Sequence, residues 1–251
     1  MRRLGYSRLV IGLAVCAVLI GAVASWARKS NHSLPQLQVG NKTRALIIES
    51  IADLGTFQVG NKQRRRFTVT VKNGYSQPVV AYAFQQKDDS LGVGTTGGTE
   101  TNGAAIGWAL PPNGTDRTHF GAPGEGEIVI TLAAVLLEDG SGDGDFEPLS
   151  RLKENRAGVK LAYQQIIPLL RRTSESNENP VSDAVIESLE NEISVTADDQ
   201  KIYINLRGGF QEAKNLILRD LRELPGRGRA LEHRAEVSKI KSRVEDVLAK
   251  L

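Results

Sequence analysis

Cysteine is almost absent from this 251-residue sequence, which excludes a fold held by disulfide bonds. The one cysteine, Cys16, lies inside an N-terminal apolar stretch, so the remainder has neither a disulfide nor a thiol for redox chemistry. About 220 residues follow that stretch, which is enough to bury one or two hydrophobic cores. We therefore expect a fold that is stabilised by apolar packing.

Histidine is also scarce, and its positions are far apart. The sequence places His32 in a polar tether, His119 in a loop and His233 on a polar helix face. Neither the HExxH zinc motif nor the GxSxG nucleophile motif occurs. The sequence therefore favours a non-enzymatic protein, with a hydrolase whose site is assembled in three dimensions as an alternative.

The longest uninterrupted apolar run lies at the N-terminus. A basic head at residues 1–8 precedes uninterrupted apolar sequence at 9–21, and small residues suited to signal peptidase follow at 22–24. This pattern is typical of a segment that directs export. Residues 1–29 are predicted to be a signal peptide or a membrane anchor.

Cleavage and retention of this segment both fit the sequence. Read through to Ala27, the apolar segment at residues 9–27 is close to the roughly 20 residues that span a bilayer. The small residues favour cleavage, whereas Trp26 followed by Arg28 and Lys29 favours an uncleaved anchor in contact with the membrane. In both cases the basic head predicts that the body lies outside the cytoplasm, in the periplasm, at the cell surface or in the medium. A retained segment would attach it to the inner membrane by a single helix.

The positive charge of the chain comes from its basic head. The sequence has 32 Lys and Arg against 29 Asp and Glu, but three of the basic residues are Arg2, Arg3 and Arg8. Without them the two totals are equal at 29. The exported part is neutral overall, so we expect no nucleic-acid partner.

Residues 43–138 have the pattern of β-strands. Polar residues 30–42 form an expected tether, after which apolar and polar side chains alternate, most clearly from Phe67 to Val71. Roughly seven strands separated by Gly- and Pro-containing turns are expected, one of them at Ala105–Leu110. This pattern predicts an antiparallel β-sandwich.

Glycine-rich segments predict the turns and loops of that region. The pentapeptide Gln38–Lys42 recurs as Gln58–Lys62, and its Gly-Asn pair predicts two similar hairpins. Gly92–Gly97 fits the dinucleotide-binding expression, but the residues up to Gly103 cannot begin the helix which that motif requires. We expect a long flexible loop there, with residues available for contact with a ligand.

From residue 147 to 251 the apolar spacing becomes helical, which predicts a C-terminal all-helical region. The first helix is expected to be kinked or broken near Pro168, and Gly208-Gly209 to open the third. Residues 229–251 have an apolar stripe flanked by charges, which suits packing within the chain or contact with a protein partner or a second copy. The four expected helices are Phe146–Arg172, Pro180–Ser194, Phe210–Leu224 and Arg229–Leu251.

An acidic, glycine-rich loop at residues 139–146 joins the two regions. Oxygen-bearing side chains stand at alternate positions, as in the first half of a calcium loop, but Ser150 occupies the place of the bidentate Glu. Calcium is the one cofactor that the sequence raises. The alternative is a strand-to-helix connection in which Asp145 caps the helix. The candidate metal ligands are Asp139, Ser141, Asp143, Asp145 and Glu147.

The segment Thr68–Val79, a strand followed by an Asn-Gly turn and Pro-Val, resembles the immunoglobulin-like sandwich domains of exported bacterial proteins. The resemblance implies an architecture without a particular activity. The expected fold is α+β: an export or anchor helix, an immunoglobulin-like antiparallel β-sandwich and a helical region. The expected function is that of a non-enzymatic binding or structural module of the cell envelope, with a calcium-stabilised adhesion-type module as the main alternative.

Overall fold

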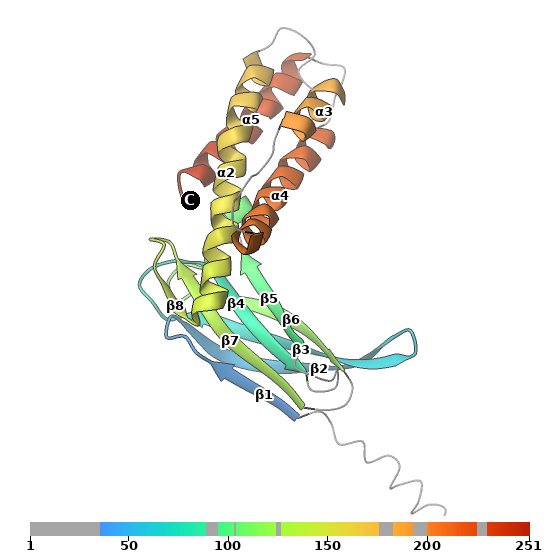
Figure 1. Cartoon of the computed structure of the whole chain (residues 1–251), viewed down its shortest axis with the longest axis vertical. Helices are drawn as coiled ribbons and strands as arrows, with labels where there is room; N and C mark the ends of the chain where they lie inside the picture. Colours follow the sequence, from blue (N-terminus) through green and yellow to red (C-terminus); the bar gives the residue numbers. More distant parts are fainter. Residues whose placement is uncertain are drawn as a thin grey trace, which may run out of the picture.

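The computed structural model describes residues 36–88, 95–102, 104–123, 127–175, 183–192, 200–224 and 230–251. The expected export helix at residues 1–29 lies outside these ranges. The fold is α+β, with two β-sheets followed by a C-terminal helical region (Figure 1). None of the helices in the described ranges contains an apolar stretch that could cross a membrane.

The larger sheet contains strands of both directions. Its order is β1-β7-β4-β5, and the short strand β8 pairs with β7. β1 runs parallel to β7, whereas the other pairs are antiparallel, so the expected purely antiparallel arrangement is wrong for this sheet. β1 also lies within the segment expected to be a tether. The strands are β1 (Gln36–Asn41), β4 (Val79–Asp88), β5 (Thr95–Asn102), β7 (Glu127–Leu137) and β8 (Gly142–Gly144).

The smaller sheet is antiparallel and shares a core with the larger one. It consists of β2 (Leu46–Val59), β3 (Lys62–Asn73) and β6 (Thr115–Pro123), in the order β2-β3-β6. The alternation predicted for β3 is confirmed, because Phe67, Val69 and Val71 are buried. They pack in one cluster with apolar residues of β4, β6 and β7, so the inner faces of the two sheets enclose this core.

Two segments between these strands differ from expectation. Residues of the expected glycine-rich loop form β5, an edge strand that is hydrogen-bonded to β4. The Thr- and Gly-rich sequence of β5 lacks apolar alternation. The segment is a strand because it pairs with β4. The strand expected at Ala105–Leu110 is a short 3₁₀ helix, Ala104–Ile106, followed by an isolated bridge from Leu110 to Val79.

The helical region contains α2 (Phe146–Glu175), α3 (Asp183–Glu192), α4 (Gln200–Arg222) and α5 (Ala230–Leu248). The predicted succession of strands and then helices is confirmed. α2 continues through Pro168, and α4 begins before Gly208-Gly209, so neither residue set forms a helix boundary. The N-terminal part of α2 covers the outer face of the larger sheet, and its remainder packs with the other helices (Figure 1).

Candidate ligand-binding face

The outer face of strands β3 and β6 in the smaller sheet is basic. β3 begins with a run of basic residues and contains no acidic residue. Because Phe67, Val69 and Val71 face inward, strand alternation directs Arg64, Arg66 and Lys72 outward. On the neighbouring strand β6, Phe120 is buried whereas Arg117 and His119 are exposed, so they lie on the same outer face.

The pairing of β3 with β6 arranges these side chains in a row. We name the row of Arg64, Arg66, His119, Arg117 and Lys72 the cationic track. Each of five successive outward pairs contributes one basic or imidazole side chain, from either strand. The pairs are Arg64 with Pro123, Arg66 with Gly121, Thr68 with His119, Thr70 with Arg117, and Lys72 with Thr115.

Among the described residues, no acidic side chain pairs with the guanidinium and ammonium groups of the track. Within the described part of the chain, Arg64, Arg66, Lys72 and Arg117 form no ion pair with a carboxylate. Asp116 of β6 faces inward and accepts a 2.8 Å hydrogen bond from the Tyr82 hydroxyl. The positive charge of the track is therefore available to a ligand.

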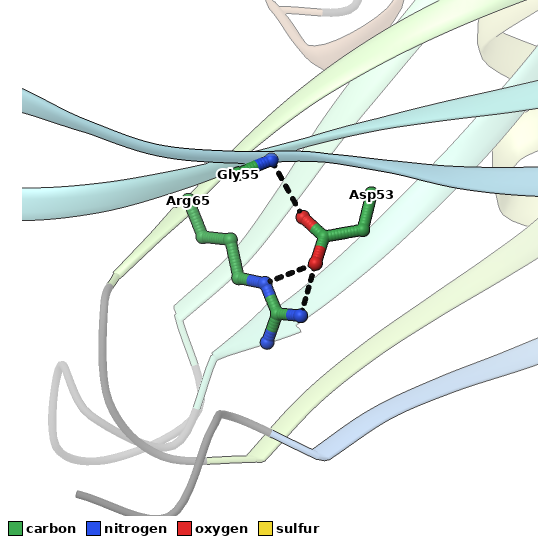
Figure 2. A network of polar contacts seen from close by, with 3 residues as sticks. All are labelled: Asp53, Gly55 and Arg65. Atoms are coloured by element: carbon green, nitrogen blue, oxygen red, sulfur yellow. Dashed lines mark hydrogen bonds and ion pairs between the residues drawn. The ribbon is translucent and has the colours of Figure 1, made fainter.

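Arg65 shows the contrasting arrangement on the inner face (Figure 2). Its Nε donates a 3.0 Å hydrogen bond to Asp53 Oδ2, and its guanidinium lies 5.1 Å from the centre of the Phe67 ring. Hydrogen bonds from Arg65 and from the Gly55 amide lower the pKa of Asp53, and the same carboxylate raises the pKa of Arg65. Arg65 is thus neutralised within the protein, unlike its two neighbours in sequence.

Asp53 and Gly55 flank a β-bulge in the hairpin of β2 and β3. The register passes from Asp53–Phe67 to Thr56–Arg65, so two residues of β2 lie opposite one residue of β3. Beyond the bulge the hairpin reaches past the ends of the other strands (Figure 1). The distal hairpin therefore lies beside the Arg64 end of the track and extends the accessible face.

An open pocket of about 420 Å³ lies at the junction of this hairpin and the track. The Arg66 guanidinium lies 4.7 Å from the centre of the Phe57 ring, which forms a cation–π contact at the pocket. His119 Nδ1 lies 2.9 Å from the Thr68 hydroxyl oxygen. The lining residues are Leu54, Phe57, Arg66, His119, Phe120 and Gly121.

The candidate calcium ligands of the acidic loop have partners within the protein. Asp139 Oδ1 accepts hydrogen bonds from the Ser141 amide at 2.9 Å and hydroxyl at 2.6 Å, which lower the pKa of Asp139. Asp143 accepts hydrogen bonds from the backbone amides of Arg44 and Ala45. These contacts tie the loop to the chain segment that enters β2.

The last two acidic candidates lie at the start of α2. Asp145 Oδ2 is 2.6 Å from the Lys42 ammonium, and Glu147 lies 3.9 Å from Arg151. β8 occupies the middle of the expected loop, where Gly144 has a φ of 109° and approaches the Ala133 backbone too closely for a side chain. Among the described residues, no three acidic, histidine or cysteine side chains converge on one point.

The apolar stripe of the last helix packs inside the chain. Val237, Ile240, Val244 and Val247 of α5 are buried in the same cluster as apolar residues of α2 and α4. Packing within the chain was one of the two interpretations of residues 229–251. Contact of this segment with a protein partner or a second copy stays a prediction.

Two histidines lie in different surroundings from those expected. His119 lies in strand β6 rather than in a loop. His233 is fully buried in α5 rather than on a polar face, and neither of its ring nitrogens has a hydrogen-bond partner among the described residues. The polar neighbours of His233 in the sequence conceal this burial, which depends on the packing of α5 against the other helices.

The cationic track was not predicted from the sequence. The alternation of apolar and polar residues placed Arg66 and Lys72 on the solvent-exposed face of β3. The basic run before Phe67 was a further sign that this face is positively charged. The contribution of Arg117 and His119 was not visible, because it depends on the register between β3 and β6.

Comparison with known proteins identifies no family for this chain. No protein-family model matches it, and no curated protein matches it. Among solved structures it is similar to the "X-ray structure of Northeast Structural Genomics Consortium target SoR45". The alignment has 14% identity and a TM-score of 0.25, and it covers 40% of this chain and 83% of the other. A likeness at this level supports no argument about fold or function.

Proposed function

We propose that this protein is a non-enzymatic binding module of the cell envelope, exported or anchored by its N-terminus, which binds an anionic ligand through the cationic track. One observation carries the proposal: four Arg and Lys side chains share one exposed sheet face without a carboxylate partner in the described structure. Unpaired charges of one sign on a surface attract ligands of the opposite sign and raise the rate of encounter.

The proposal includes an immunoglobulin-like sandwich as the scaffold. The segment Thr68–Val79 and the core shared by the two sheets support this interpretation. The parallel pairing of β1 with β7 departs from the simplest antiparallel form. A sandwich of this kind holds its outer faces rigid, which suits a surface that has to match a ligand.

The arrangement around His119 favours binding over hydrolysis. A histidine that activates a side-chain nucleophile needs one that the substrate can reach. Its hydrogen-bond partner here is Thr68, whose side chain is buried with an exposure of 7%. We therefore assign His119 to the binding face rather than to a catalytic pair.

Binding to heparin-agarose tests the proposal directly. The full-length protein is expected to bind at low salt and to elute as ionic strength rises, because salt screens exposed charges. The double variant Arg66→Glu/Lys72→Glu is expected to elute at clearly lower salt. Lys153→Glu/Lys160→Glu changes the formal charge equally on exposed positions of α2 and serves as the matched control.

Wild-type protein that passes through heparin-agarose at low salt would overturn the proposal. Equal weakening by the track and α2 variants would overturn the assignment to this face, since it would indicate an effect of net charge alone. Circular dichroism of each variant establishes that the fold is retained.

A further inference from the structure

We infer that the ligand of the cationic track is an extended acidic polysaccharide, whose acidic groups pair successively with the side chains from Lys72 to Arg64. This inference rests on the proposed function and specifies its ligand class. It follows from the spacing of the charges, the character of the surface between them and the pocket at one end.

The spacing of the track suits a linear ligand with a repeating charge. Outward positions along a strand recur about every 6.7 Å, so the four steps from Lys72 to Arg64 extend over about 27 Å. The cationic groups follow one another in single file across β3 and β6 rather than converging on one point. A single small anion would meet one or two of them, whereas an extended polyanion would meet all of them.

The surface between the charges is polar. The outward positions of β3 and β6 that are not cationic include Thr70 and Thr115, together with Gly121, whereas the Thr68 side chain is buried and hydrogen-bonded to His119. Hydroxyl groups can donate hydrogen bonds to a sugar and accept them from it. The outward positions of these two strands include no large apolar side chain that could insert into a bilayer. On the neighbouring strand β2 the exposed large apolar side chains are Ile47, Ile51, Leu54 and Val59. Ile51 pairs with the inward-facing Val69, and Ser50 and Ala52 separate Ile47 from Leu54 on the outward side.

The pocket provides a place for one sugar unit. Phe57 lies in the pocket beside Arg66 and His119. The apolar face of a sugar ring could pack against Phe57 while the acidic substituent of the same sugar pairs with Arg66 or His119. Single-stranded nucleic acids are bound by several aromatic side chains on which successive bases stack. In the described structure one aromatic ring, Phe57, lies beside the track, so successive bases would find no series of rings on which to stack. This favours a polysaccharide over a nucleic acid.

Binding of oligogalacturonates of increasing length to the full-length protein tests the inference. Isothermal titration at constant uronate concentration is expected to show affinity that rises with length until the chain spans the track and then levels off. Galacturonate monomer is expected to bind at least tenfold more weakly than the longest chain, because it meets few of the cations. An oligothymidylate of matched charge and vesicles containing anionic lipid are expected to bind more weakly than the longest oligogalacturonate.

Charge reversal at either end shortens the track and should reveal its length. Arg64→Glu and Lys72→Glu are each expected to weaken binding of the longest chain by roughly fivefold, as loss of an exposed charge pair does. Neither change is expected to alter binding of the shortest chain to the same degree. Lys160→Glu on α2 is the matched control and is expected to have no effect.

The outcomes separate the inference from the function on which it rests. Heparin binding without a dependence on oligogalacturonate length would overturn the inference and leave the proposed function intact. Tighter binding to oligothymidylate or to anionic vesicles than to the longest oligogalacturonate would also overturn the inference. It would identify a nucleic acid or a membrane as the ligand of the track. Absence of binding to heparin and to every probe would overturn both.

Discussion

At the scale of single residues, buried polar groups fix the connections between the strands. Asn73 is fully buried, and its amide donates hydrogen bonds to the backbone carbonyls of Gln77 at 2.8 Å and Leu110 at 3.0 Å. Its Oδ1 accepts a 2.9 Å hydrogen bond from the Tyr75 amide. A buried amide satisfied in this way positions the turn between β3 and β4 more precisely than apolar packing could.

Tyr163 of α2 supports a prediction about pH. Its hydroxyl donates a hydrogen bond to the Ala105 carbonyl, and burial raises the pKa of Tyr163 from 10.0 to about 12. Since the folded state favours the neutral phenol, this contribution to stability is complete below about pH 10 and is lost as pH rises towards 12. Tyr163→Phe is expected to lower the free energy of unfolding by about 1–3 kcal/mol at pH 8, because it leaves the buried carbonyl unpaired.

Urea unfolding of wild type and Tyr163→Phe from pH 8 to pH 11.5 measures this effect. The difference between the two proteins is expected to shrink above pH 10, while lysine titration affects both alike. A difference that stays constant over that range would contradict the assignment of the raised pKa to this hydroxyl.

At the scale of elements, the crossing of α2 and α4 depends on two glycines. A Cβ atom on Gly158 would overlap the Leu206 carbonyl, and one on Gly209 would overlap the Asn155 carbonyl. The backbones of the two helices therefore touch at this point, and any larger residue has to separate them. The neighbouring Gly208 has space, since its Cβ would lie 3.7 Å from the Asn155 amide nitrogen.

Gly209→Ala is expected to lower the free energy of unfolding by about 2 kcal/mol or more, as overpacking in a tight contact does. Gly208→Ala is the matched control, and it is expected to be neutral or to stabilise by up to about 1 kcal/mol, because alanine favours the helix. Thermal and urea denaturation of the two single variants would make the comparison. Equal effects at the two positions would show that the helices are not in backbone contact.

The connection between β7 and α2 supports a prediction about calcium. The carboxylates of Asp143 and Asp145 already bind backbone amides and Lys42, so a calcium ion would have to displace these partners. The melting midpoint is therefore expected to be the same in excess calcium and in excess chelator. A midpoint that rises with calcium, and falls again in Asp139→Asn/Asp143→Asn, would support the calcium-stabilised module instead.

At the scale of the whole molecule, α2 joins the sheets to the helical region. Its first turns place Leu152 against Val80, Ala83 and Leu136 on the outer face of the larger sheet, and its later turns enter the helical core. The 30 residues of this helix extend about 45 Å, so a single rigid element takes part in both cores. The stability of the two parts should therefore be coupled.

Leu152→Ala is expected to lower the free energy of unfolding by about 2–5 kcal/mol, because it leaves a cavity in a fully buried position. Helical circular dichroism and near-ultraviolet aromatic signals are expected to shift together to lower urea. The control is Lys153→Ala, a substitution of the adjacent exposed residue. It is expected to alter the free energy of unfolding by less than about 0.5 kcal/mol. A helical signal that kept its wild-type midpoint would show that the two parts unfold independently.

The local pattern of the sequence was enough to predict the succession of strands and helices and to identify the residues of β3 that face the core. The local pattern was less informative where the secondary structure of a segment depends on pairing with another strand. The Thr- and Gly-rich residues of β5 have no apolar alternation, and they form a strand because β4 pairs with them. The burial of His233 and the glycine contact between α2 and α4 likewise depend on how helices pack.

The candidate site shows the same division. The sequence by itself determined that β3 is basic on the side away from the core, because periodicity within one strand is a local property. The tertiary structure alone decided that Arg117 and His119 of β6 join Arg64, Arg66 and Lys72 in one row, and that Arg65 is neutralised by Asp53. Strand register and cross-strand ion pairs join residues distant in sequence, and the closure of the fold determines which of them meet.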